Sequence, residues 1–339
     1  AKGACFAAME ILKPEVFKNV IMLLDNGLRP SRYYITNDGF LILSSEVGVL
    51  EVPEEKIVLK ERLHPGKMLL VNTVQGKVLN DEEVKEYYAK KQPYGEWLDS
   101  YLVQLKDIKI PNLPVEEYTK EERMRLQKAF GYTYEEYRSS IGKMALNGVE
   151  ATASMGIDTT LAVLSHEHQP LFNYFKQLFA QVTNPPIDCI REEIVTSTSV
   201  YVGRDGNLLE EEPKNCQVLK INNPILTNTD MLKIKNMKVE GFKAVTVPIT
   251  YYKSAPLDRA MDRLFVEVDR AHRAGANILI LSDRGVDENH VAIPSLLAVS
   301  AVHQHLVKTK KRTSLAIILE SGEPREVHHF ATLLGYGPC

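Results

Sequence analysis

The side chains best suited to chemistry concentrate in one stretch, NILILSDRGVDENHVAIPSLLAVSAVHQHL (residues 277–306), which contains Asp283, Arg284, Asp287, Glu288, Asn289, His290, His303 and His305. Because the stretch opens with an apolar run of strand length, Asp283 and Arg284 lie just past the carboxyl end of a predicted strand. In α/β folds, ligands and catalytic side chains collect at that edge of the sheet. One interpretation is a substrate site with Asp283 and His290 as acid–base partners, Arg284 as a further catalytic candidate and Asn289 as a binding candidate.

A structural interpretation of the same residues stays open. In it the stretch is a loop between a strand and a helix, and Asp283 and Arg284 pair with each other. Asn289 or Asp287 then accepts hydrogen bonds from helix amides. Both interpretations require the same residue types, so the pattern does not separate them.

The spacing of the histidines does not favour a metal site. His303 and His305 are two residues apart and therefore point to different faces of a helix. Glu326 and His329 have the spacing of a di-metal motif, but such a site needs the motif twice together with further carboxylates. The cysteines lack the CxxC spacing of zinc and iron–sulfur sites: they are Cys5, Cys189, Cys216 and Cys339. We expect reduced thiols and no metal.

Two further places contain candidate binding residues. Arg29 and Arg32 lie in NGLRPSRYY, which fits either an anion or amino-acid site or a turn fixed by proline with solvated arginines. Glu320 ends a second apolar run, TSLAIILE, at a second strand carboxyl end. Phosphate-binding glycine loops and the GxSxG and HExxH motifs do not occur in the sequence.

The elements that must position these residues change along the chain. Residues 20–80 predict antiparallel strands, with hairpin turns at Asp38-Gly39 and Gln75-Gly76. Residues 81–121 predict helices and a connector with prolines, and capped helices begin at Thr119 and Thr133. An aromatic stripe over residues 170–182 predicts a helix that packs on the core. The last third alternates helices with apolar strands, which predicts an α/β fold with a parallel sheet flanked by helices.

Composition limits the classes of function. The 339 residues exceed one core, so two or three structural units are expected. The formal net charge of −3, from 41 basic and 44 acidic side chains, does not predict a nucleic-acid or anionic-membrane binder. The sequence contains no apolar run long enough to span a bilayer and no signal-peptide pattern at its start, so a cytoplasmic protein is expected.

Several long phrases together resemble one family, the glutamate synthase large subunit. DNGLRPSRYYITNDGFLILSSEVGVL and KERLHPGKMLLVNTVQGKVLNDEEVK resemble the end of its amidotransferase domain. LQKAFGYTYEEYRSSIGKMALNGVEATASMGIDTTLAVLS, PLFNYFKQLFAQVTNPPIDCIREE and the stretch from ILILSDRGVDENH to LLGYG resemble its central domain. The resemblance runs in order from about residue 22 to residue 337.

The resemblance implies a division of the chain and a role. Residues 1–80 would be a remnant of an amidotransferase domain of the Ntn type, 81–121 a connector, and 122–339 the central domain. In this family, ammonia freed from glutamine by a glutaminase domain travels inside the protein to an FMN and iron–sulfur synthase domain, where it meets 2-oxoglutarate. This chain would support and guide that transfer, with the glutaminase and synthase domains or subunits as partners, and FMN and the cluster bound outside it.

The departures from the family pattern matter for activity. The family's glutaminase nucleophile is an N-terminal cysteine followed by glycine, whereas Cys5 follows four residues and precedes Phe6. We therefore expect a chain that is inert alone, whether it is an excised fragment, a split-gene subunit or a repurposed relative. The alternatives are an independent small-molecule enzyme or binding protein using the loops around Asp283 and Glu320, and an interaction scaffold.

Overall fold

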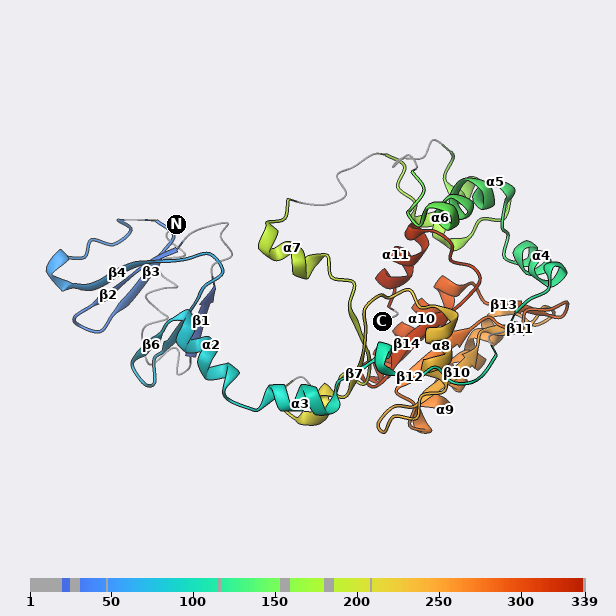
Figure 1. Cartoon of the computed structure of the whole chain (residues 1–339). Coiled ribbons are helices and arrows are strands. Elements are labelled where there is room, and N and C mark those ends of the chain that lie inside the picture. The colour runs from blue at the N-terminus through green and yellow to red at the C-terminus, as the bar shows by residue number, and fades with distance from the viewer. Residues whose placement is uncertain are drawn as a thin grey trace. The chain divides into compact units, whose positions relative to one another are not determined.

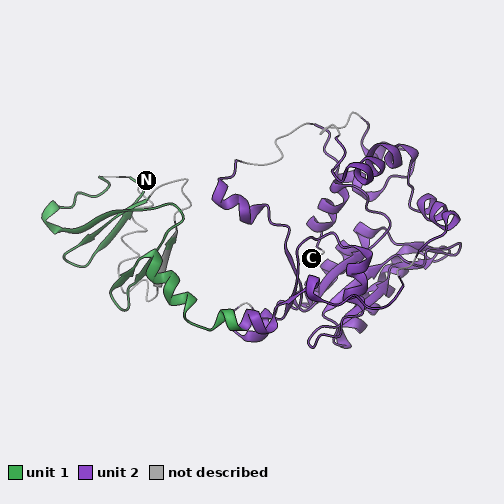
Figure 2. Ribbon diagram, in the orientation of Figure 1, with its two compact units in different colours: residues 1–96 green, residues 97–339 purple. Residues whose placement is uncertain are grey.

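The computed structural model describes residues 20–24, 31–46, 48–114, 117–152, 159–179, 186–207 and 209–337. The chain forms two compact units, residues 1–96 and residues 97–339 (Figure 2). Within the described ranges, no helix is both long and apolar enough to cross a membrane.

The first unit consists of two antiparallel sheets. One sheet has the order β3-β2-β4, with β2 Ser31–Thr36, β3 Leu41–Ser44 and β4 Ile57–Leu63. The other has the order β1-β5-β6, with β1 Val20–Leu24, β5 Met68–Asn72 and β6 Lys77–Leu79. Their apolar faces share one core that includes Tyr33, Leu41, Leu63, Leu69 and Val71.

The hairpin turns and the first helix of this unit form where the sequence patterns indicate. The hairpin between β2 and β3 turns at Gly39 and the hairpin between β5 and β6 at Gly76, with φ of 85° and 62°. Such left-handed backbone is where glycine is favoured. Helix α2 Asp81–Ala89 starts with a capping box in which Asn80 and Glu83 bond each other's backbone. The predicted antiparallel strands of residues 20–80 are confirmed.

The second unit is built around a parallel sheet of order β10-β12-β14 (Figure 1). Its strands are β10 Ala244–Pro248, β12 Ile278–Ser282 and β14 Ala316–Glu320. One face, with Leu279 and Ile317, packs on α9 Leu257–Arg273, α10 Ser295–Lys308 and α11 Val327–Gly335. The other face, with Ile278 and Ile280, packs on α8 Asn228–Lys235 and on the strands β8 Val200–Gly203 and β9 Val218–Ile221. This confirms an α/β fold with a parallel sheet covered on both faces.

Short elements complete the second unit. Two small sheets are β7-β9-β8 (β7 Val103–Gln104, β8 Val200–Gly203, β9 Val218–Ile221) and β11-β13 (β11 Thr250–Tyr252, β13 His290–Ala292). Four helices stand outside the sheets: α4 Lys120–Ala129, α5 Tyr134–Glu136, α6 Gly142–Asn147 and α7 Cys189–Val195. Helix α3, Tyr94–Tyr101, contains the division between the units. The capping boxes predicted at Thr119 and Thr133 are both present.

The helix predicted over residues 170–182 is wrong in the described part of that range. Residues Leu171–Phe175 form a short 3-10 helix after Pro170, and residues 176–179 are not helical. Only Phe172 of the aromatic stripe is buried, and its ring stacks on His329 of α11 at a centroid distance of 4.4 Å. Phe175 and Phe179 are exposed, because a single 3-10 turn presents too short a face to bring all three rings to the core.

Candidate functional site

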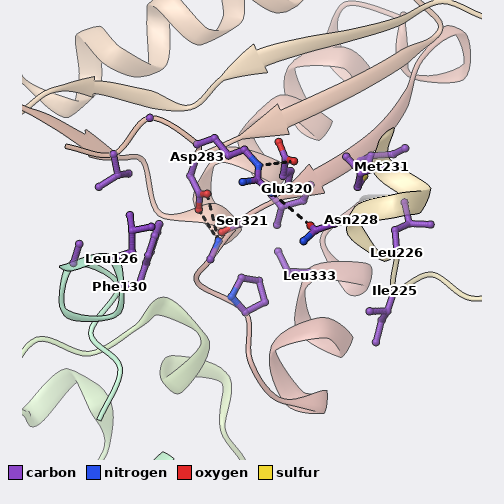
Figure 3. Close-up of a pocket in the computed structure, with 18 of the residues that line it drawn as sticks. Leu126, Phe130, Ile225, Leu226, Asn228, Met231, Asp283, Glu320, Ser321 and Leu333 are labelled. Atoms are coloured by element: carbon purple, nitrogen blue, oxygen red, sulfur yellow. Dashed lines mark hydrogen bonds and ion pairs between the residues drawn. The ribbon is translucent and has the colours of Figure 1, made fainter. Parts of the chain in front are cut away.

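The candidate site lies where the strands β12 and β14 end. The two strands run parallel with Ser282 opposite Glu320, so the loops that follow them emerge side by side. The loop after β12 contains Asp283 and Arg284, and the loop after β14 contains Ser321 and Gly322. The predicted location of Asp283, Arg284 and Glu320 at one sheet edge is therefore what the structure shows (Figure 3).

Glu320 is the centre of an ionic network at this edge. Its carboxylate accepts hydrogen bonds from Lys235 Nζ at 2.9 Å, Arg284 Nε at 2.8 Å and Ser282 Oγ at 2.6 Å. Burial alone would raise the pKa of Glu320, but the three donors outweigh it and hold the pKa below its usual value. Glu320 is thus an ionised, fully engaged carboxylate.

Arg284 has a different partner from the one predicted. Besides Glu320, its guanidinium donates to Tyr118 Oη at 2.8 Å and lies 3.5 Å from Asn228 Oδ1. The Asp283–Arg284 pair expected from the sequence is not the pairing that forms, because the side chain of Arg284 turns toward the neighbouring strand. Arg284 therefore ties the β12 loop to β14 and to the segment before α4.

Asp283 accepts hydrogen bonds from neutral donors of the β14 loop. Its oxygens lie 3.0 and 3.3 Å from the backbone N of Gly322, and Ser321 donates a side-chain hydrogen bond. The residue is 6% exposed, and burial raises the pKa of Asp283 to about 6. Among the described residues, Asp283 forms no ion pair. A carboxyl group with this pKa changes charge near neutral pH, which is typical of functional sites as well as of buried structural groups.

His290 does not lie with Asp283 as an acid–base pair. It begins β13, and its Nδ1 lies 3.0 Å from both carboxylate oxygens of Asp287. Asp287 also accepts from the backbone N of Asn289 and of His290, at 2.7 and 2.8 Å. The prediction that Asp287 or Asn289 accepts hydrogen bonds from helix amides is therefore wrong, because Asp287 bonds amides of its own loop and α10 begins five residues beyond His290. The amide of Ser295 at the start of α10 bonds Glu323 Oε2 at 2.7 Å.

The other predicted residues belong to other segments of the chain. Arg32 is exposed on β2 of the first unit, opposite Ser44 and Arg62, and forms no ion pair among the described residues. Arg29 and Cys5 lie outside the described residues. His303 accepts a hydrogen bond from Arg312 Nε at 3.0 Å, whereas His305 contacts Asp269, so the two histidines have different partners.

Two further histidines, His305 and His329, contact acidic side chains. His305 lies 3.1 Å from Asp269 and stacks on Phe265. His329 Nε2 lies 3.3 Å from Glu326 Oε1. In the described part of the chain, no group of three or more His, Cys, Asp or Glu is placed to hold a metal ion.

A cavity of about 1000 Å³ opens onto this edge of the sheet. Asp283, Arg284 and Glu320 line its floor, and Leu126 and Phe130 of the α4 segment line the opposite side (Figure 3). Further apolar lining comes from the α8 region and α11: Ile225, Leu226, Met231 and Leu333. Sequence reasoning missed this cavity, because its walls come from segments as far apart as Tyr118 and Leu334 that share no motif.

The α4 segment is held over the cavity at both ends. At its start, Tyr118 receives the hydrogen bond from Arg284. At its end, Tyr132 Oη donates to Gly322 O at 2.8 Å, and Arg325 donates to Phe130 O at 3.2 Å. Gly322 has no room for a side chain, since a Cβ there would lie 2.9 Å from the Phe130 ring. Helix α4 itself has no buried residue.

Comparison with known proteins gives two family matches along the chain. Residues 17–97 match the family described as glutamine amidotransferases class-II, and residues 125–339 match the family described as glutamate synthase central domain. The second match covers more than half of the chain.

Curated relatives match across almost the whole chain. It is 46% identical to the glutamate synthase (NADPH) large chain of Bacillus subtilis over 325 residues, which is 94% of this chain and 21% of the relative. It is 41% identical to the glutamate synthase (NADH) of Schizosaccharomyces pombe, with 92% of this chain and 15% of the relative covered. It is 39% identical to ferredoxin-dependent glutamate synthase 2 of Synechocystis, with 92% and 20% covered. The chain thus spans about a fifth or less of the length of these relatives.

Proposed function

The chain belongs to the glutamate synthase central domain family, and on this basis we propose that it works as one segment of a glutamate-forming enzyme. In the proposal, residues 1–80 are the last strands of an Ntn-type amidotransferase domain, 81–121 are a connector and 122–339 are the central domain. The observation that carries the proposal is that two family matches follow one another in the order of the longer relatives.

The proposed role is structural and ammonia-guiding. Ammonia released from glutamine in a glutaminase domain would pass along this segment to a synthase domain that forms glutamate from 2-oxoglutarate. A parallel sheet buried on both faces makes a rigid wall for such a path. The network around Glu320 supports this view, because its members bond one another and so stabilise the sheet edge.

The proposed partners and cofactors lie outside residues 1–339. The glutaminase and synthase domains, or separate subunits, would contact this segment, and FMN and the iron–sulfur cluster would be bound by the synthase part. The scattered cysteines support this assignment, since a cluster needs several thiolates at close spacing.

A second candidate function is that of a small-molecule enzyme or binding protein. The cavity at the carboxyl ends of β12 and β14, with the buried carboxyl group of Asp283 on its floor, favours it. The separation of His290 from Asp283 weakens the enzyme form, because the acid–base pair expected from the sequence does not assemble.

A chimera tests the leading proposal. The matching segment of the Bacillus subtilis large chain is replaced by this chain, and glutamine consumed and glutamate formed are both measured. If the segment guides ammonia, the two rates stay in step and little free ammonia appears in solution. The chimera supplied with ammonium chloride in place of glutamine is the control for an intact synthase site. An inactive or unfolded chimera, with the parent enzyme active under the same conditions, would count against membership in this assembly.

A further inference from the structure

We propose that the cavity beneath α4 binds a small organic cation, an amine whose ammonium group pairs with Asp283 while its apolar body lies against the cavity walls. This binding site goes beyond the leading proposed function, since neither the supporting nor the ammonia-guiding role requires an organic ligand, and it names a ligand class for the second candidate function, on which it rests. The proposal rests on three features of the second unit: the cavity's size and lining, the unsatisfied charge of Asp283, and the way α4 covers the cavity.

The cavity has the size and lining of a ligand site. Its volume of about 1000 Å³ lies at the upper end of the range for drug-sized ligands. Leu126, Phe130, Met231 and Leu333 come from three separate helical segments and give it apolar walls. A ligand with an apolar body is therefore favoured over a small inorganic ion, which would leave these walls unfilled.

Asp283 is the polar group of the cavity whose carboxylate has acceptor positions left for a ligand. An ionised carboxylate offers about four acceptor positions, and the described donors to Asp283 are Ser321 and the amide of Gly322. It forms no ion pair among the described residues, and the charges that raise its pKa are the neighbouring carboxylates Glu323 and Glu320. A ligand cation would supply the opposite charge that this buried group lacks.

The other charges around the cavity also favour a cation. The lining includes five carboxylate side chains and three guanidinium side chains: Glu122, Asp283, Asp287, Glu288 and Glu320, against Arg123, Arg125 and Arg284. Arg284, the guanidinium on the floor, is already paired with Glu320 at 2.8 Å. An anionic ligand would meet the excess of carboxylates, so a carboxylate or phosphate head group is disfavoured.

The α4 segment covers the cavity without filling it. It is fixed at its ends by Tyr118 and Tyr132, whereas α4 has no buried residue between them. Leu126 and Gln127 are the half-buried residues of α4, both line the cavity, and Figure 3 shows the apolar one, Leu126. A helix held at its ends above an open space can admit a ligand without breaking its tethers.

The test compares three probes of the same shape: 4-phenylbutylamine, 4-phenylbutanol and 4-phenylbutyrate, titrated into the chain of residues 1–339 by calorimetry near pH 7.5. We expect the amine to bind at least about tenfold more tightly than the alcohol, since a hydrogen bond to a charged group contributes more than a neutral one. The carboxylate should bind most weakly. Asp283→Asn should reduce the affinity for the amine to that for the alcohol.

Two further variants make the result specific. Asp269→Asn is the matched control, because Asp269 pairs with Lys311 and His305 away from the cavity, and it should leave all three affinities unchanged. Leu126→Trp should fill the cavity from above and weaken all three probes, which tests the site even if Asp283→Asn does not fold. The proposal is overturned if no probe binds, if the amine shows no preference over the alcohol, or if Leu126→Trp leaves binding intact. That failure would leave the leading proposed function standing, because the chimera tests it by a separate measurement.

Discussion

Replacing Glu320 by glutamine removes the one anion that two cations share at the sheet edge. Glutamine keeps an oxygen that can accept from Ser282 but removes the negative charge that Lys235 and Arg284 both contact. Breaking a buried ion pair by removing one partner costs about 3–5 kcal/mol. The side chains of Lys235 and Arg284 are 27% and 30% exposed, so water compensates part of the loss. We expect the free energy of unfolding to fall by about 2–3 kcal/mol.

A double-mutant cycle measures how much of this loss of stability comes from the Glu320–Arg284 ion pair. Arg284→Ala leaves Glu320 with Lys235 and Ser282, so it should cost less, about 1–2 kcal/mol. The double variant should lose about 1 kcal/mol less free energy of unfolding than the sum of the two single variants, because it removes both charges of the Glu320–Arg284 pair. The same cycle on Asp283 and Arg284 should be close to additive, since Arg284 pairs with Glu320 and not with Asp283.

Urea unfolding followed by circular dichroism measures these changes, and amide hydrogen exchange in β14 assigns them to the second unit. Glu267→Gln is the matched control: Glu267 bonds the exposed Arg270 at 2.8 Å, and its loss should cost less than about 0.5 kcal/mol. The pKa of Glu320 is lowered in the folded state, so its contribution is present above the usual value of 4.5 and is lost as pH falls further. The reasoning is refuted if Glu320→Gln costs no more than the control, or if its cost does not shrink in acid.

Three other outcomes are expected. Burial raises the pKa of Asp283 from 3.8 to about 6, so the folded state loses stability as pH rises through that interval. Near pH 8, Asp283→Asn should therefore melt at a higher temperature than the wild type, with a free energy of unfolding larger by up to about 3 kcal/mol. This gain in stability should vanish below about pH 4, and a gain independent of pH would contradict the reasoning. The purified chain should be colourless after gel filtration, because no phosphate-cradling glycine loop occurs in its sequence, and a stoichiometric flavin spectrum would show otherwise. The chain should not hydrolyse glutamine, because Cys5 is not an N-terminal residue with its own α-amino base, and ammonia release above that of a Cys5→Ser variant would disprove this.

The predictions that succeeded depend on contacts between residues close in sequence. Thr119 and Glu122 form their capping box within one helical turn, and the hairpin at Gly39 closes over four residues. Such contacts are decided by residue type and spacing, so a sequence pattern is enough to identify them. The aromatic stripe at residues 172, 175 and 179 failed for the opposite reason. Whether a face is buried depends on what packs against it, and here only Phe172 meets α11.

The sequence by itself determined that Asp283, Arg284 and Glu320 stand at the carboxyl ends of buried strands, because apolar runs of strand length precede them. Their partners were decided only by the tertiary structure. The parallel register that sets Ser282 opposite Glu320 brings Arg284 to Glu320, 36 residues away, and the α4 segment adds Tyr118 from 166 residues away. A charged side chain pairs with the opposite charge that tertiary packing places within about 3 Å. The distance between two residues along the sequence does not determine which charge that is.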